Sequence, residues 1–82
     1  MALTHTIKSF TEDGSGNVDV GFQVQDDKGD IFYIDKIITK GSKTDEVIVE
    51  EGYNAAKAEI DAWVASNNNI GKTWDPSSKS LS

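Results

Sequence analysis

Residues 18–25 constrain the fold of this chain more than any other segment. Apolar side chains occupy every second position, and a polar residue or glycine stands at each position between them. Because successive side chains of a β-strand point to opposite faces, this alternation predicts a strand with one face in a core and one in water. The four residues 26–29 then predict a hairpin turn into an antiparallel partner. The apolar positions are Val18, Val20, Phe22 and Val24.

The segment that follows this turn, residues 31–40, is apolar on both faces. Such a strand is typical of the centre of a sheet, where both faces are covered. The pair Asp35-Lys36 interrupts the apolar pattern and predicts a β-bulge. One face carries Phe32, Ile34 and Ile38, and the other carries Ile31, Tyr33 and Ile37.

The N-terminal segment, residues 3–10, alternates only weakly and is expected to form an edge strand. Regular alternation would place Ile7 on one face and Phe10 on the other. Residues 11–17 contain two glycines and several turn-forming residues, so a turn is expected between this strand and the next.

Residues 44–67 are expected to form one helix. Thr44 is a suitable N-cap, and the two acids after it complement the positive helix end. Against this, Val47-Ile48-Val49 favours a strand, and Gly52 costs about 1 kcal/mol inside a helix. A fourth strand over residues 46–50, with the helix starting at Tyr53, is the alternative. Steps of three and four predict a buried stripe of Val49, Tyr53, Ala56, Ile60, Trp63 and Asn67.

Together these elements predict an α+β fold. A small antiparallel sheet of three strands, or four under the alternative, packs against one C-terminal helix in β-β-β-α order, and an extended tail follows. Residues 1–71 are expected to form a single domain, and residues 72–82 a polar C-terminal arm. Trp74 stands out in that arm. It either docks back on the sheet or anchors another chain, since tryptophan is enriched among interface hot spots.

Composition excludes several classes of function. Fourteen acidic residues against eight lysines, with no arginine, give a net charge of −6, which disfavours binding to nucleic acids and to anionic membranes. The absence of cysteine excludes disulfide frameworks and thiolate metal sites. The first residues lack the features of a signal peptide, and no apolar run could span a bilayer. We expect a virion or cytoplasmic protein, neither membrane-bound nor secreted through a signal peptide.

Segments that resemble functional motifs fail at defining positions. Gly71-Lys72-Thr73 lacks the earlier glycine of a phosphate-binding loop, because Ser66 stands there. Residues 13–19 alternate like the start of an EF-hand loop, but Val18 occupies the position that requires glycine. No catalytic partner set can be placed around His5, the only histidine. We therefore expect no catalytic residue, metal site, cofactor or small-molecule substrate, and hence no enzyme.

The predicted sheet leaves one apolar face to be covered. A single helix covers one face only, so the other needs the tail or a second subunit, and uncovered apolar patches usually mark association sites. We expect Ile31, Tyr33, Ile37 and Trp74 to bind a protein partner, either another copy or a larger assembly. This favours a non-enzymatic structural or assembly subunit. The alternative is a small acidic binding or inhibitory protein whose helix acids contact a basic protein surface.

Four features of the chain together resemble the small acidic, cysteine-free proteins of tailed bacteriophage particles. They are the alternating strand at residues 18–24, the apolar strand at 31–38, the alanine-rich helix at 54–63 and the arm at 72–82. The resemblance implies a structural or accessory role in a virion. It is general and assigns a role to no individual residue.

Overall fold

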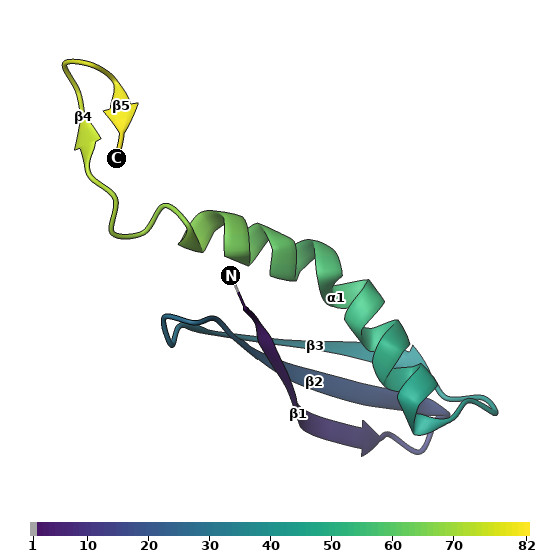
Figure 1. Ribbon diagram of the computed structural model, residues 1–82. Helices are drawn as coiled ribbons and strands as arrows, with labels where there is room; N and C mark the ends of the chain where they lie inside the picture. The colour runs from purple at the N-terminus through teal and green to yellow at the C-terminus, as the bar shows by residue number, and fades with distance from the viewer. Residues whose placement is uncertain (1) are drawn as a thin grey trace.

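The computed structural model describes residues 2–82 and shows a three-stranded antiparallel sheet packed against one long helix (Figure 1). The predicted α+β fold in β-β-β-α order is therefore confirmed. A second, two-stranded sheet follows the helix. The elements are β1 (Thr4–Glu12), β2 (Asn17–Gln25), β3 (Ile31–Thr39), α1 (Asp45–Asn67), β4 (Trp74–Asp75) and β5 (Ser80–Leu81).

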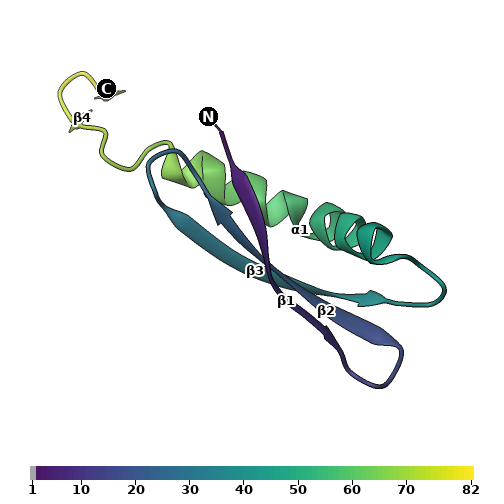
Figure 2. The same ribbon diagram turned by 60° about the horizontal axis from the view of Figure 1, so that its bottom comes forward.

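The central strand of the sheet is β2, which pairs with β1 on one side and with β3 on the other. Short turns join these strands, and such connections place consecutive strands side by side. β3 is therefore an edge strand, and the expectation that its two apolar faces would put it at the centre was wrong. Helix α1 runs along one side of the sheet (Figure 1 and Figure 2), so it covers only one face of β3.

A β-bulge lies in β1 at Lys8, where the pairing with β2 shifts between Ile7 and Ser9. The extra residue brings Phe10 back to the face that carries Ile7, contrary to regular alternation. Bulges are common on edge strands because only one ladder of hydrogen bonds is disturbed.

The bulge expected at Asp35-Lys36 is absent, because both residues pair regularly with β2. Lys36 is nevertheless accommodated on the helix-facing side. Its ammonium group lies 2.9 Å from the carboxylate of Glu59 in α1. Lys36 is therefore accommodated by an ion pair with Glu59, and the register of β3 stays regular.

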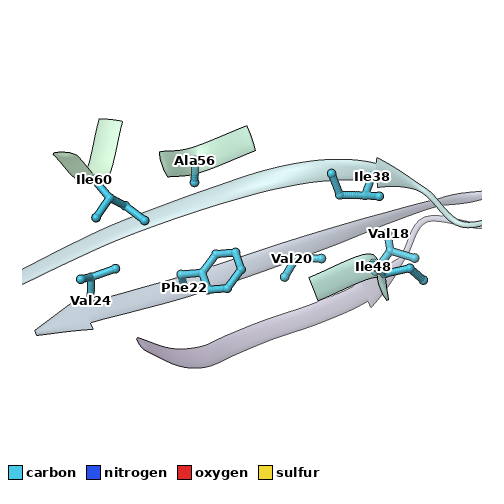
Figure 3. Packing of buried hydrophobic residues seen from close by; sticks show 8 residues of the cluster. All are labelled: Val18, Val20, Phe22, Val24, Ile38, Ile48, Ala56 and Ile60. Carbon is cyan, nitrogen blue, oxygen red and sulfur yellow. The ribbon is translucent and has the colours of Figure 1, made fainter. Parts of the chain in front are cut away.

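The core lies between β2 and α1 (Figure 3). The alternating residues of β2 are almost completely buried, as their period of two predicts. At one margin the ring of Trp63 stacks on that of Phe32, with ring centroids 5.5 Å apart. Burial of each large apolar side chain contributes roughly 1.5–3 kcal/mol, so this layer holds the helix on the sheet. The buried apolar residues are Val18, Val20, Phe22, Val24, Ile38, Ile48, Ala56 and Ile60.

The helix is continuous, so the single helix is confirmed and the alternative strand over residues 46–50 is not formed. Thr44 is its N-cap, and its hydroxyl accepts a hydrogen bond from the Val47 N–H at 3.4 Å. The most buried stripe is rotated from the predicted one. Val49, Tyr53 and Trp63 lie at its margin and are partly buried. Its fully buried members are Ile48, Gly52, Ala56, Ile60 and Asn67.

Gly52 explains this rotation. A Cβ atom at this position would lie 3.3 Å from the ring of Phe22 and 3.4 Å from Val20, closer than most side-chain contacts. Glycine therefore allows the helix backbone to lie directly on β2. This close approach offsets the helix propensity that glycine loses.

The C-terminal end of α1 is tied to the turn between β2 and β3. The side-chain amide of Asn67 donates hydrogen bonds to the carboxylates of Asp26, at 2.7 Å, and Asp30, at 2.9 Å. Burial opposes ionisation of Asp26, but the backbone N–H groups of Asp30 and Lys28 and the Asn67 amide outweigh it. They hold the pKa of Asp26 below its usual value. Asn67, the polar residue at the end of the buried stripe, thus has hydrogen-bond partners for its side-chain amide.

Residues 72–82, the arm, form a small hairpin in place of the extended tail that we expected. Trp74 pairs with Leu81 across it, and Thr73 and Ser82 exchange two backbone hydrogen bonds of 2.8 and 2.9 Å. Neither strand of the arm contacts the three-stranded sheet or α1. The arm projects from the body, residues 2–71, and gives the molecule extents of 58 × 19 × 17 Å (Figure 1).

Candidate protein-binding surface

The sheet face turned away from α1, here called the open face, carries three large apolar side chains from β3. Ile31, Tyr33 and Ile37 are 43%, 65% and 68% exposed. Their neighbours in sequence point to the helix, so strand alternation directs these three outward. The structure thus places three of the four predicted binding residues on one face. Tyr33 and Ile37 are separated by about 13 Å along the strand.

A shallow hollow of about 250 Å³ opens on this face between β1 and β3, and Gly21 of β2 is among the residues that line it. In the sheet register, Gly21 lies between Ser9 of β1 and Asp35 of β3. A Cβ atom on Gly21 would collide with the hydroxyl oxygen of Ser9, which would have to rotate away. The hollow is lined by Lys8, Ser9, Gly21, Phe22, Tyr33, Ile34 and Asp35.

Two carboxylates are diagonal neighbours on the open face. Asp35 of β3 lines the hollow and pairs with Gly21 of β2. Asp19 lies two residues before Gly21 on β2 and pairs with Ile37. Burial, and after it the neighbouring carboxylate of Asp35, raises the pKa of Asp19 above its ordinary value. The Oδ1 atom of Asp19 is buried and accepts no hydrogen bond from the described residues. The open face therefore has a buried acceptor without a donor at Asp19. An unpaired buried acceptor is unfavourable.

The raised pKa predicts a stability effect for Asp19→Asn. Below the ordinary value of 3.8, Asp19 is protonated in the folded and the unfolded chain, and no penalty exists. As pH rises above that value, the folded state must hold an unfavourable charge. The variant should therefore unfold at a higher urea concentration than wild type at neutral pH, and the gain should vanish in acid. Glu50→Gln removes an exposed charge as the control, and an equal gain there would contradict this explanation.

The fourth predicted residue, Trp74, lies apart from the other three. It is 58% exposed on the arm, beside Leu81 at 50%. The predicted binding residues therefore form two separate exposed apolar surfaces, one on the sheet and one on the arm. The hollow was not predicted from the sequence. A glycine inside a strand often marks a bulge or a close backbone approach, so Gly21 could have indicated an irregular site in the sheet. The sequence around Lys8 contains no such indication of the bulge.

His5 packs edge-to-face on Tyr53, with ring centroids 5.3 Å apart. No three His, Cys, Asp or Glu side chains of the described residues are grouped to hold a metal ion. In the same part of the chain, no helix is both long and apolar enough to cross a membrane. Comparison with protein-family models, curated proteins and solved structures found no match to this chain.

Proposed function

We propose that this chain is a non-enzymatic structural subunit that assembles with copies of itself through protein–protein contacts. We propose a virion as the setting of this role, in keeping with the general resemblance to small proteins of tailed bacteriophage particles. One observation carries the proposal: the molecule exposes large apolar side chains on two separate surfaces, the open face and the arm. Uncovered apolar surface of this kind is characteristic of association sites.

The arm supports the proposal because it has little to stabilise it alone. Its two strands are two residues long each, and an isolated two-stranded hairpin is marginally stable in water. Trp74 and Leu81 remain half exposed, with no contact between their strands and the body. Docking on another chain would bury both side chains and order the hairpin.

The charge distribution weighs against the alternative of an acidic protein that binds a basic surface. That function needs a continuous set of free acids on the helix. Three helix acids already form ion pairs with lysines: Glu51 with Lys43, Glu59 with Lys36 and Asp61 with Lys57, at 2.8–2.9 Å. The helix surface is therefore partly neutralised.

Replacing Trp74 with alanine tests the proposal. Because tryptophan hot spots contribute about 2 kcal/mol or more to association, the dissociation constant should rise by about 30-fold or more. Sedimentation velocity over a concentration series measures this change, and circular dichroism should show an intact fold. Val47→Ala, which shortens another exposed apolar side chain, should leave association unchanged. Loss of the fold in Trp74→Ala with association unaltered would contradict the proposal.

A further inference from the structure

We propose that the arm of one copy binds the hollow of the next copy, with the indole ring of Trp74 seated against Tyr33. This inference rests on the proposed function and names the two surfaces that meet. Three observations carry it: the separation of arm and hollow within one chain, the chemistry of the hollow, and the opposite charges of the arm and the body.

The arm and the hollow of one chain lie on different sides of the molecule. The hollow opens on the sheet face opposite α1, whereas the arm continues from the C-terminal end of α1 and projects beyond the sheet (Figure 1 and Figure 2). Backbone hydrogen bonds within residues 64–72 hold the connecting segment in successive turns. Because the direction of the arm is set by these turns, the arm that enters a hollow comes from another copy.

The hollow suits a single aromatic side chain. Its volume of about 250 Å³ lies below the roughly 300–1,000 Å³ of small-molecule pockets. Tyr33 contributes an aromatic ring to its lining, and aromatic rings pair favourably in offset or edge-to-face arrangements. An indole also carries one N–H donor. The carboxylate of Asp35, which lines the hollow, supplies an acceptor for that donor.

Counted over their side chains, the arm and the body carry opposite net charges. Thirteen of the fourteen acidic residues and six of the eight lysines lie in the body, which leaves it strongly negative. The arm has two lysines, Lys72 and Lys79, and one acid, Asp75. Such complementarity directs the arm of one copy to the body of another and increases the association rate. The apolar burial of Trp74 then holds the contact at high salt.

The contact joins two different surfaces, so it is heterologous. Each copy that donates its arm keeps its own hollow free for a further copy. Repetition of such a contact gives a ring when the rotation closes and an open filament when it does not. A subunit of this kind suits a repetitive structure.

Mixing two complementary variants tests the inference. Trp74→Ala keeps the hollow and loses the arm contact, whereas the double variant Tyr33→Ala, Asp35→Lys keeps the arm and loses the hollow. Both hollow residues are exposed, so the fold should survive. We expect wild type to form oligomers and each variant alone to be monomeric. The mixture should form a one-to-one dimer and nothing larger, as light scattering measures. Asp27→Lys, a charge change in an exposed turn, should assemble like wild type.

The outcomes separate this inference from the proposed function. If the hollow variant assembles like wild type while Trp74→Ala does not, the arm binds elsewhere, and only the inference fails. The inference also fails if both variants are monomeric and their mixture stays monomeric. If wild type itself is monomeric at every concentration, both the inference and the proposed function fail.

Cross-linking gives a second test that leaves Trp74 and the hollow side chains Tyr33 and Asp35 intact. The chain has no cysteine, so single cysteines can be introduced at Lys8, one of the residues that line the hollow, and at Ser77, in the arm. A short bismaleimide should join Lys8→Cys to Ser77→Cys in a mixed dimer. Lys8→Cys with Ser42→Cys, in the turn before α1, should not be joined. Equal yields from the two mixtures would overturn the assignment of the arm to the hollow.

Discussion

Replacing Phe22 with alanine should lower the free energy of unfolding by about 3–5 kcal/mol, the usual cost of deleting a buried phenylalanine ring. Phe22 is 3% exposed in the middle of the central strand. Its ring lies against the helix backbone at Gly52, so the variant leaves a cavity between the two layers that neither layer can close. At about 0.05–0.15 kcal/mol per residue, a chain of this size has a total stability of roughly 4–12 kcal/mol. The loss would therefore remove at least about a quarter of the total stability.

Phe10→Ala is the matched control for this prediction. Phe10 lies on the same sheet face, but on the edge strand, and is 37% exposed. Its removal should cost less than half as much, because less apolar surface is lost from the core. Urea denaturation monitored by circular dichroism measures both values. Equal losses in the two variants would show that the contact between β2 and α1 is not the centre of the core.

Gly52→Val should destabilise the fold by about 1–3 kcal/mol, the range for overpacking a well-filled core. Two added methyl groups have no room where even a Cβ atom lies 3.3 Å from Phe22 and 3.4 Å from Val20. The helix would have to move away from the sheet. That movement would loosen its contacts with the whole of β2.

Gly52→Ala separates crowding from helix propensity. Alanine gains about 1 kcal/mol of helix propensity over glycine, and its single methyl group requires a shift of only a few tenths of an ångström. We therefore expect its stability in urea denaturation to lie close to that of wild type. If Gly52→Val were as stable as Gly52→Ala, the close approach of the helix to β2 would not be a constraint.

The strands and the helix could be predicted because their signals are local. The alternation in β2 reflects the geometry of its own backbone, and Thr44 caps the helix through contacts within one turn. Both signals can therefore be recognised without knowing how the elements pack. The β-β-β-α order then follows from short turns between consecutive elements.

The errors concern contacts between elements. β3 has two apolar faces, and local pattern cannot say whether the second is covered by the same chain or left exposed at a sheet edge. The predicted stripe of α1 followed the spacing of its larger side chains, whereas the buried stripe contains Gly52, which lies against Phe22 and Val20 of β2. The bulge at Lys8 and the hollow at Gly21 likewise depend on pairing between strands.

The candidate site was predictable in its apolar part only. Ile31, Tyr33 and Ile37 are exposed together on β3 because the helix covers the opposite face. Trp74 lies on a hairpin apart from these residues because it pairs with Leu81. Strands of two residues are too short to give a recognisable pattern in a sequence. The neighbouring carboxylates, Asp19 and Asp35, are distant in sequence and meet only through the register of β2 and β3.

The most direct test of the central claim is the mass of the wild-type protein in solution. Light scattering behind a sizing column, over a range of protein concentrations and at low and high salt, measures it. Self-assembly through apolar surface predicts a mass above the 8.9 kDa of one chain, rising with protein concentration and retained at high salt, because screening weakens exposed charge pairs but not apolar burial. A mass of 8.9 kDa at every concentration would contradict the claim that this chain is a self-assembling subunit.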